Sequence, residues 1–130
     1  QAESIAKFIM NHPKTPKDKI PVWDYDVHNA LETAERAPRD ASAAAVIASA
    51  LLDLSTQVKD GKKYFDYAEN ILESLSSEAY LAKPGENGLF ILKHSTGAML
   101  YNSEIDTPLD YADYYYLEAL KRYKEIKKII

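Results

Sequence analysis

Apolar residues recur every three to four positions along four segments of the chain, which is the spacing of an amphipathic helix. The pattern predicts four helices, over about residues 2–10, 41–59, 62–80 and from 108 to the chain end. In the first of these, Ile5, Phe8 and Ile9 are spaced to form one apolar face. The last begins at Pro108, and proline is favoured in the first turn of a helix. The sequence therefore predicts an all-α fold.

The second predicted helix differs from the third in the distribution of its apolar residues. The third has a single apolar stripe, whereas the second is apolar or small on nearly every side, with Val46, Ile47, Ala50, Leu51, Leu54 and a run of alanines from residue 41. A helix of this kind is usually buried, with neighbours on several sides. We therefore expect the second helix to lie between other helices.

The connections between the predicted helices alternate in length. About thirty residues join the first helix to the second, nearly as many join the third to the fourth, and little more than Asp60-Gly61 joins the second to the third. Long loops without regular structure are usually functional. In an up-and-down array both long loops fall at the same end of the helices. The pattern predicts part of an alternating helical toroid, with its site at the long-loop end.

Composition excludes several classes of function. The chain is 46% hydrophobic and 28% charged, and 16 basic against 20 acidic residues give a net charge of −4. It has no basic stripe with interleaved aromatic residues, so we expect no nucleic-acid partner. The lack of cysteine excludes disulfides, thiolate catalysis and cysteine zinc sites. No apolar run approaches the roughly 20 residues that span a membrane, so we expect no membrane partner. No cofactor is expected either.

The 130 residues fit one domain, and we expect residues 1–130 to fold as such. The first ten residues, QAESIAKFIM, resemble the interior of a helix. This suggests that the chain is a piece of a longer protein, and it leaves the cellular compartment open.

The first long loop carries the segment IPVWDYD, residues 20–26. Trp23 could offer a stacking face for a sugar, and Asp24 and Asp26 could offer acceptor oxygens. Alternatively, Trp23 fills a gap in the core while the two aspartates make turn hydrogen bonds. The sequence favours neither interpretation.

The second long loop carries GLFILKHSTG, residues 88–97, in which a short β-like apolar run leads to Lys93, His94 and Ser95. A cation, an imidazole and hydroxyl groups in one tight segment could bind a carboxylate or a sulfate. A single histidine is more often structural, and no second histidine or carboxylate lies at the spacing of a metal site. A Ser-His-Asp triad is also not indicated, because no nucleophile elbow is present.

Two aspartates lie at the starts of predicted helices. Asp40 is a suitable N-cap for the second helix, which does not explain the adjacent Arg39. In the last helix, YADYYYLEAL places Asp113 and Tyr114 in the first turns. At least two of the tyrosines of this segment are expected to be core residues.

Taken together, the motifs PVWDYD, PRDASAAAVIASALLDLS, YFDYAENILESL, ILKHSTG and SEIDTPLDYADYYYLEAL resemble the C-terminal part of the unsaturated glucuronyl hydrolases of glycoside hydrolase family 88. The resemblance extends from Ile20 to Arg122. It implies part of an (α/α)6 toroid, and an enzyme acting on oligosaccharides that polysaccharide lyases leave with a 4,5-unsaturated uronic acid at the non-reducing end. In the family an aspartic acid protonates the double bond, water adds, and the resulting hemiketal opens to release the sugar.

The family's catalytic aspartates belong to its earlier half, so the resemblance implies no catalytic residue in this chain. The expected substrate-binding residues are Arg39, Lys93, His94, Ser95 and Trp23. Asp40, Asp113 and Tyr114 are expected to be structural residues at the pocket rim. The expected partners are an unsaturated uronyl oligosaccharide, and either the missing N-terminal half or a second copy that covers the open helix flanks.

Two other interpretations remain. Unsaturated rhamnogalacturonyl hydrolases share the implied fold and chemistry but release another sugar. A non-catalytic helical-repeat module would show self-similarity at a fixed period, and the sequence shows none.

Overall fold

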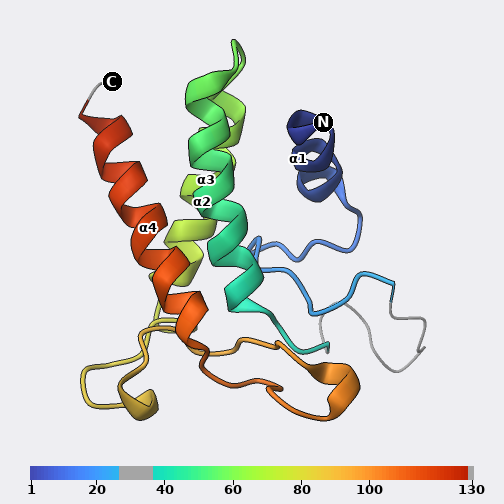
Figure 1. The fold of residues 1–130 in the computed structure, drawn as a ribbon, viewed down its shortest axis with the longest axis vertical. Coiled ribbons are helices and arrows are strands. Elements are labelled where there is room, and N and C mark those ends of the chain that lie inside the picture. Colours follow the sequence, from blue (N-terminus) through green and yellow to red (C-terminus); the bar gives the residue numbers. More distant parts are fainter. Residues whose placement is uncertain (27–36, 129–130) are drawn as a thin grey trace.

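The computed structural model describes residues 1–26 and 37–128 (Figure 1). Its helices are α1 (Ala2–Asn11), α2 (Ala41–Gln57), α3 (Lys62–Leu75) and α4 (Asp110–Lys127). Two short 3-10 helices, η1 (Asn87–Leu89) and η2 (Met99–Tyr101), lie in the second long loop. Within the described residues, β-type pairing of the backbone occurs only as isolated bridges, and no strand is formed. The all-α prediction is therefore confirmed.

Helix α2 is the centre of the packing and contacts both α3 and α4 extensively. Its small side chains allow this close approach, and Ala41, Ala44, Ala45, Ala48 and Leu52 are completely buried. The opposing residues from α3 are Tyr64, Phe65, Ala68, Ile71, Leu72 and Leu75. Helix α4 adds Ala112, Tyr116 and Ala119. Helix α2 thus lies between other helices, as predicted, while one stripe of it remains open, because Val46 and Ala50 are exposed.

The two long loops lie at one end of the helices and the short α2–α3 turn at the other (Figure 1). The loops also touch. Tyr80 from the second loop donates a hydrogen bond to Asp18 from the first, at 2.7 Å. Residues 27–36 of the first loop fall outside the described part of the chain. The predicted gathering of the loops at one end is confirmed by the rest.

Two predicted helix limits were wrong. Helix α3 ends at Leu75 rather than near Tyr80, where the Ser77 hydroxyl donates to the carbonyl of Ser74. Serine hydroxyls compete in this way with helical backbone bonds. Helix α4 begins at Asp110 rather than Pro108, because Thr107 exchanges two backbone hydrogen bonds with Ser95 and is held extended.

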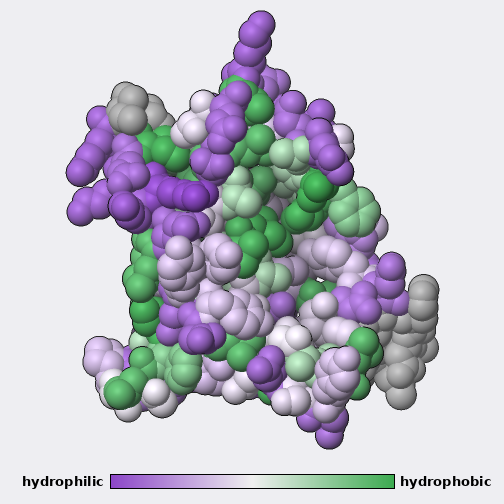
Figure 2. All heavy atoms as spheres, in the orientation of Figure 1, coloured by the Kyte–Doolittle hydropathy of each residue, from purple (hydrophilic) through white to green (hydrophobic). Residues whose placement is uncertain are grey.

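The apolar face predicted for α1 is present but uncovered. Ile5 and Phe8 are 55% and 64% exposed, and Ala6 is the buried residue of this helix. Helix α1 contacts α2 only slightly. Figure 2 shows further hydrophobic side chains at the surface of the molecule. The exposed large hydrophobic residues of α4 are Tyr111, Tyr114 and Leu117.

Candidate functional site

Asp40 joins the start of α2 to the second long loop. Its Oδ1 atom accepts hydrogen bonds from the backbone N–H groups of Ser42 at 3.0 Å and Ala43 at 3.3 Å, which is the N-cap predicted from the sequence. The same oxygen accepts from the backbone N–H of Thr96 at 3.3 Å. The Thr96 hydroxyl in turn donates to the carbonyl of Arg39 at 3.0 Å. The loop that carries the candidate site is therefore fixed to the N-terminus of a buried helix.

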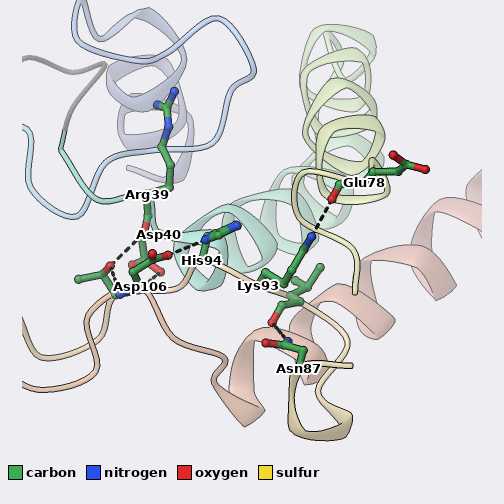
Figure 3. A network of polar contacts seen from close by, with 9 residues as sticks. Arg39, Asp40, Glu78, Asn87, Lys93, His94 and Asp106 are labelled. Atoms are coloured by element: carbon green, nitrogen blue, oxygen red, sulfur yellow. Dashed lines mark hydrogen bonds and ion pairs between the residues drawn. The ribbon is translucent and has the colours of Figure 1, made fainter. Parts of the chain in front are cut away.

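Arg39 extends in a different direction from the other candidate residues. Figure 3 shows its guanidinium pointing away from His94 and Lys93. It donates from Nη1 to the carbonyl of Ile20 at 3.2 Å and lies 3.7 Å from the Asp18 carboxylate. Tyr80 donates to the same carboxylate. Burial, and then this hydrogen bond, raise the pKa of Tyr80, so its phenol remains a neutral donor. Arg39 thus holds the first long loop against the start of α2.

His94 lies at the base of a hairpin-like arm, residues 94–107. Its Nδ1 atom is 2.5 Å from Oδ1 of Asp106 (Figure 3), and both side chains are partly open to solvent. The backbone carbonyl of His94 accepts from the N–H of Ala41, the first residue of α2. His94 has a φ of 65° and Asp106 a φ of 51°. Left-handed backbone is uncommon for residues other than glycine and concentrates at functional sites.

Lys93 and Ser95 flank His94 but point elsewhere. Lys93 donates from Nζ to the carbonyl of Glu78 at 2.7 Å (Figure 3). Ser95 is fully buried, and its backbone pairs with Thr107 at the base of the arm. Its Oγ atom has no hydrogen-bond partner among the described residues. His94 is therefore the one member of the predicted trio whose side chain stands with a charged partner at the loop surface.

Trp23 is partly buried next to the start of α2. Its backbone N–H donates to the carbonyl of Pro38 at 3.0 Å, while its indole Nε1 is buried without a hydrogen-bond partner in the described part of the chain. Asp24 accepts at 2.7 Å from the N–H of Asp26, which is the turn hydrogen bond of the second interpretation. The contacts of this segment favour an anchoring role.

Asp113 connects α4 to the second loop. Its two carboxylate oxygens accept from the backbone N–H groups of Ile91 at 2.8 Å and Leu92 at 2.9 Å. Tyr114, the next residue, is 61% exposed. Tyr116 is buried and its hydroxyl lies 2.8 Å from that of Ser76, as expected for a core tyrosine with its hydroxyl at the rim.

The sequence interpretation missed two residues that hold this end together, which are Asp18 and Asp106. Each acts on a segment distant in sequence, so local patterns gave no direct sign of it. The only signal was the run of polar residues directly before α4, which includes Asp106. Among the described residues, no group of three or more histidine, aspartate and glutamate side chains is placed to hold a metal ion. Nor does any helix of that part have the length and apolar character needed to cross a membrane.

Comparison with known proteins places this helical segment. The chain is 52% identical, over 94% of its length, to the unsaturated glucuronyl hydrolase of Formosa agariphila. It is 78% identical, over 97% of its length and with a TM-score of 0.92, to a crystal structure of an unsaturated glucuronyl hydrolase specific for heparin. The chain belongs to the unsaturated glucuronyl hydrolase family. It spans 29% of the Formosa enzyme and 33% of the heparin-specific one. No protein-family model matches it.

A third relative links this segment to a saccharide complex. The chain is 28% identical, with a TM-score of 0.71, to a mutant unsaturated glucuronyl hydrolase from Streptococcus agalactiae complexed with dGlcA-GalNAc6S. The match covers 86% of this chain and 30% of the Streptococcus chain. These neighbours are (α/α)6 toroids, so the four helices correspond to about a third of such a ring. The predicted fold class and family resemblance are both confirmed.

Proposed function

We propose that this chain is the C-terminal portion of an unsaturated glucuronyl hydrolase and forms one wall of its substrate pocket. The observation that carries the proposal is the 52% identity to the Formosa enzyme over 94% of the chain. The geometry agrees with it, because both long loops, Asp40 and the His94 segment gather at one end of the helices. The substrate class is an oligosaccharide with a 4,5-unsaturated uronic acid at its non-reducing end.

The proposed reaction is the hydration of the enol-ether double bond. A general acid delivers a proton to one carbon of the double bond and water adds to the other, and the hemiketal that forms then opens and releases the remaining saccharide. A general acid must reach its substrate and exchange a proton. Asp40 and Asp113 already use their carboxylates to accept backbone N–H groups. Because these carboxylates are engaged in structural hydrogen bonds, the catalytic acid is placed outside this chain.

The remaining polar groups suit binding rather than proton transfer. His94 lies with Asp106 at the surface of the loop after η1, and the Nζ atom of the adjacent Lys93 has one hydrogen bond, to the carbonyl of Glu78. The buried hydroxyl of Ser95 has no partner among the described residues. Donors of this kind match a uronate carboxylate or a sulfate ester. We assign the binding of the saccharide's acidic groups to this segment.

The open apolar flanks support a larger assembly. Ile5 and Phe8 of α1, Val46 of α2, and Leu117 of α4 are all exposed in the described structure. Large uncovered apolar surfaces mark interaction sites. We propose that the N-terminal half of the toroid covers them, or, in its absence, a second copy of the chain.

We expect the chain by itself to show no turnover of an unsaturated glucuronyl disaccharide, because the proposed catalytic acid lies outside it. The measurement is the loss of the ultraviolet absorbance of the conjugated double bond. An unsaturated rhamnogalacturonyl disaccharide serves as the second substrate, and turnover of it would favour the related hydrolase class. Hydration of either disaccharide by the purified chain would contradict the placement of the acid.

A further inference from the structure

The side chain of Arg39 borders a groove on the side of the fold away from His94. Figure 3 shows the guanidinium directed away from the His94–Asp106 pair. The groove is formed by one segment of the first long loop together with this arginine, and its lining residues are Pro13, Lys14, Thr15, Pro16, Lys17, Asp18 and Arg39. Arg39 therefore faces a surface that the His94 segment does not reach.

The loop segment that forms the groove is held in a defined shape. Two consecutive turns close with backbone hydrogen bonds of 3.0 Å, from Thr15 to His12 and from Lys19 to Pro16. The Thr15 hydroxyl lies 3.1 Å from that of Tyr25. Two prolines fix further backbone angles in the segment. Such a segment loses little conformational entropy when a ligand binds to it.

The charges lining the groove do not cancel. Among the described residues Asp18 is the one acidic residue lining the groove, and it lies 3.7 Å from the Arg39 guanidinium while accepting hydrogen bonds from Tyr80 and from the N–H of Ile20. Lys14 and Lys17 are exposed and add two positive charges, and the Lys14 ammonium also donates one hydrogen bond to the carbonyl of Tyr25. This local excess contrasts with the net charge of −4 of the whole chain.

We propose that this groove is an anion-binding site that takes a sulfate or carboxylate group of an acidic saccharide at the positive charges of Arg39, Lys14 and Lys17. The geometry requires only an anion, and the choice of a saccharide rests on the proposed function. Arg39 presents several N–H donors in a planar fork that suits sulfate and carboxylate oxygens. Its Nη1 contact with Ile20 fixes the fork without using all of those donors.

The test compares the wild-type chain with the double variant Lys14→Gln/Lys17→Gln. Binding of a saturated heparin tetrasaccharide is measured by calorimetry, so the result does not depend on turnover. Loss of two exposed charges should weaken binding about tenfold, and added salt should reduce the difference because it screens surface charges. The matched control is Lys121→Gln/Lys124→Gln, which removes two exposed charges from α4 and should bind like the wild type.

Parallel titrations identify the source of the anion. Inorganic sulfate should bind far more weakly than the tetrasaccharide, and single-stranded DNA should bind no better than inorganic sulfate. Equal binding by both double variants would overturn the site, and tight binding of free sulfate or of DNA would overturn the saccharide assignment. If the chain binds the tetrasaccharide as proposed but the longer enzyme does not hydrate unsaturated saccharides, the proposed function fails and the groove proposal stands. If the longer enzyme hydrates unsaturated saccharides but the lysine substitutions in the groove do not change tetrasaccharide binding, only the groove proposal is refuted.

Discussion

Replacing Asp113 with asparagine is expected to lower the free energy of unfolding by about 2–4 kcal/mol, because two backbone N–H groups lose a charged acceptor. The carboxylate of Asp113 accepts from Ile91 and Leu92 at 2.8 and 2.9 Å, and Leu92 is completely buried. An asparagine oxygen can replace one acceptor, while its NH2 group faces the second N–H. The loop that leads to Lys93 and His94 should therefore loosen along with the loss of stability.

Asp110→Asn is the matched control for this variant. Asp110 lies in the same first turn of α4 and is exposed, and within the described part of the chain its carboxylate accepts only from the adjacent N–H of Tyr111, at 2.7 Å. Both variants remove one negative charge near a helix N-terminus, an effect of about 0.3–1 kcal/mol. Urea unfolding gives the stability, and hydrogen exchange reports the amides of Ile91 and Leu92. Equal losses in the two variants would show that the helix dipole, and not the loop contact, explains the effect.

Replacing Gly61 with alanine is expected to destabilise the protein by about 3 kcal/mol, at the upper end of the range for overpacked sites. A Cβ atom at this position would lie 1.8 Å from the carbonyl oxygen of Ser55 and 2.8 Å from its carbonyl carbon. Both atoms belong to the backbone of α2, so no side-chain rotation can relieve the clash. The turn would have to open, which separates α2 from α3 at the end opposite the loops.

Gly85→Ala separates steric clash from backbone strain. Nothing lies within 4 Å of a Cβ built at Gly85, but its φ is 85°. Adopting that left-handed conformation costs an alanine about 1–2 kcal/mol. Thermal unfolding of the two variants should therefore show a clearly larger loss for Gly61→Ala. A smaller loss for Gly61→Ala than for Gly85→Ala would mean that the α2–α3 turn is not closely packed.

Helical periodicity and loop length predicted the frame of this protein because both depend on local sequence. Four amphipathic segments with alternating connections were sufficient to place the two long loops at one end. The same reasoning could not place the ends of α3 and α4. The Ser77 hydroxyl and the backbone pairing of Thr107 with Ser95 decide those ends, and the second of these depends on how the arm folds.

The contacts around the candidate site could not be predicted in the same way, because they join segments distant in sequence. The partners of Arg39, Asp18 and Ile20, lie about twenty residues earlier in the sequence, so the local pattern around Arg39 gave no sign of them. The His94–Asp106 pair joins residues on either side of the arm, and both have left-handed backbone, which the local sequence pattern did not predict. In contrast, the cap at Asp40 follows a local rule, and it was predicted correctly.

The most direct test of the account is a chimera in which this chain replaces the matching third of the heparin-specific relative, to which it is 78% identical. Absorbance at the unsaturated bond of a glucuronyl disaccharide gives the rate, and thermal unfolding confirms that the chimera is folded. We expect turnover within about tenfold of the parent enzyme, a change of about 1.4 kcal/mol in the barrier. A folded chimera that binds the disaccharide but does not hydrate it would contradict the assignment of this chain to the pocket wall of an unsaturated glucuronyl hydrolase.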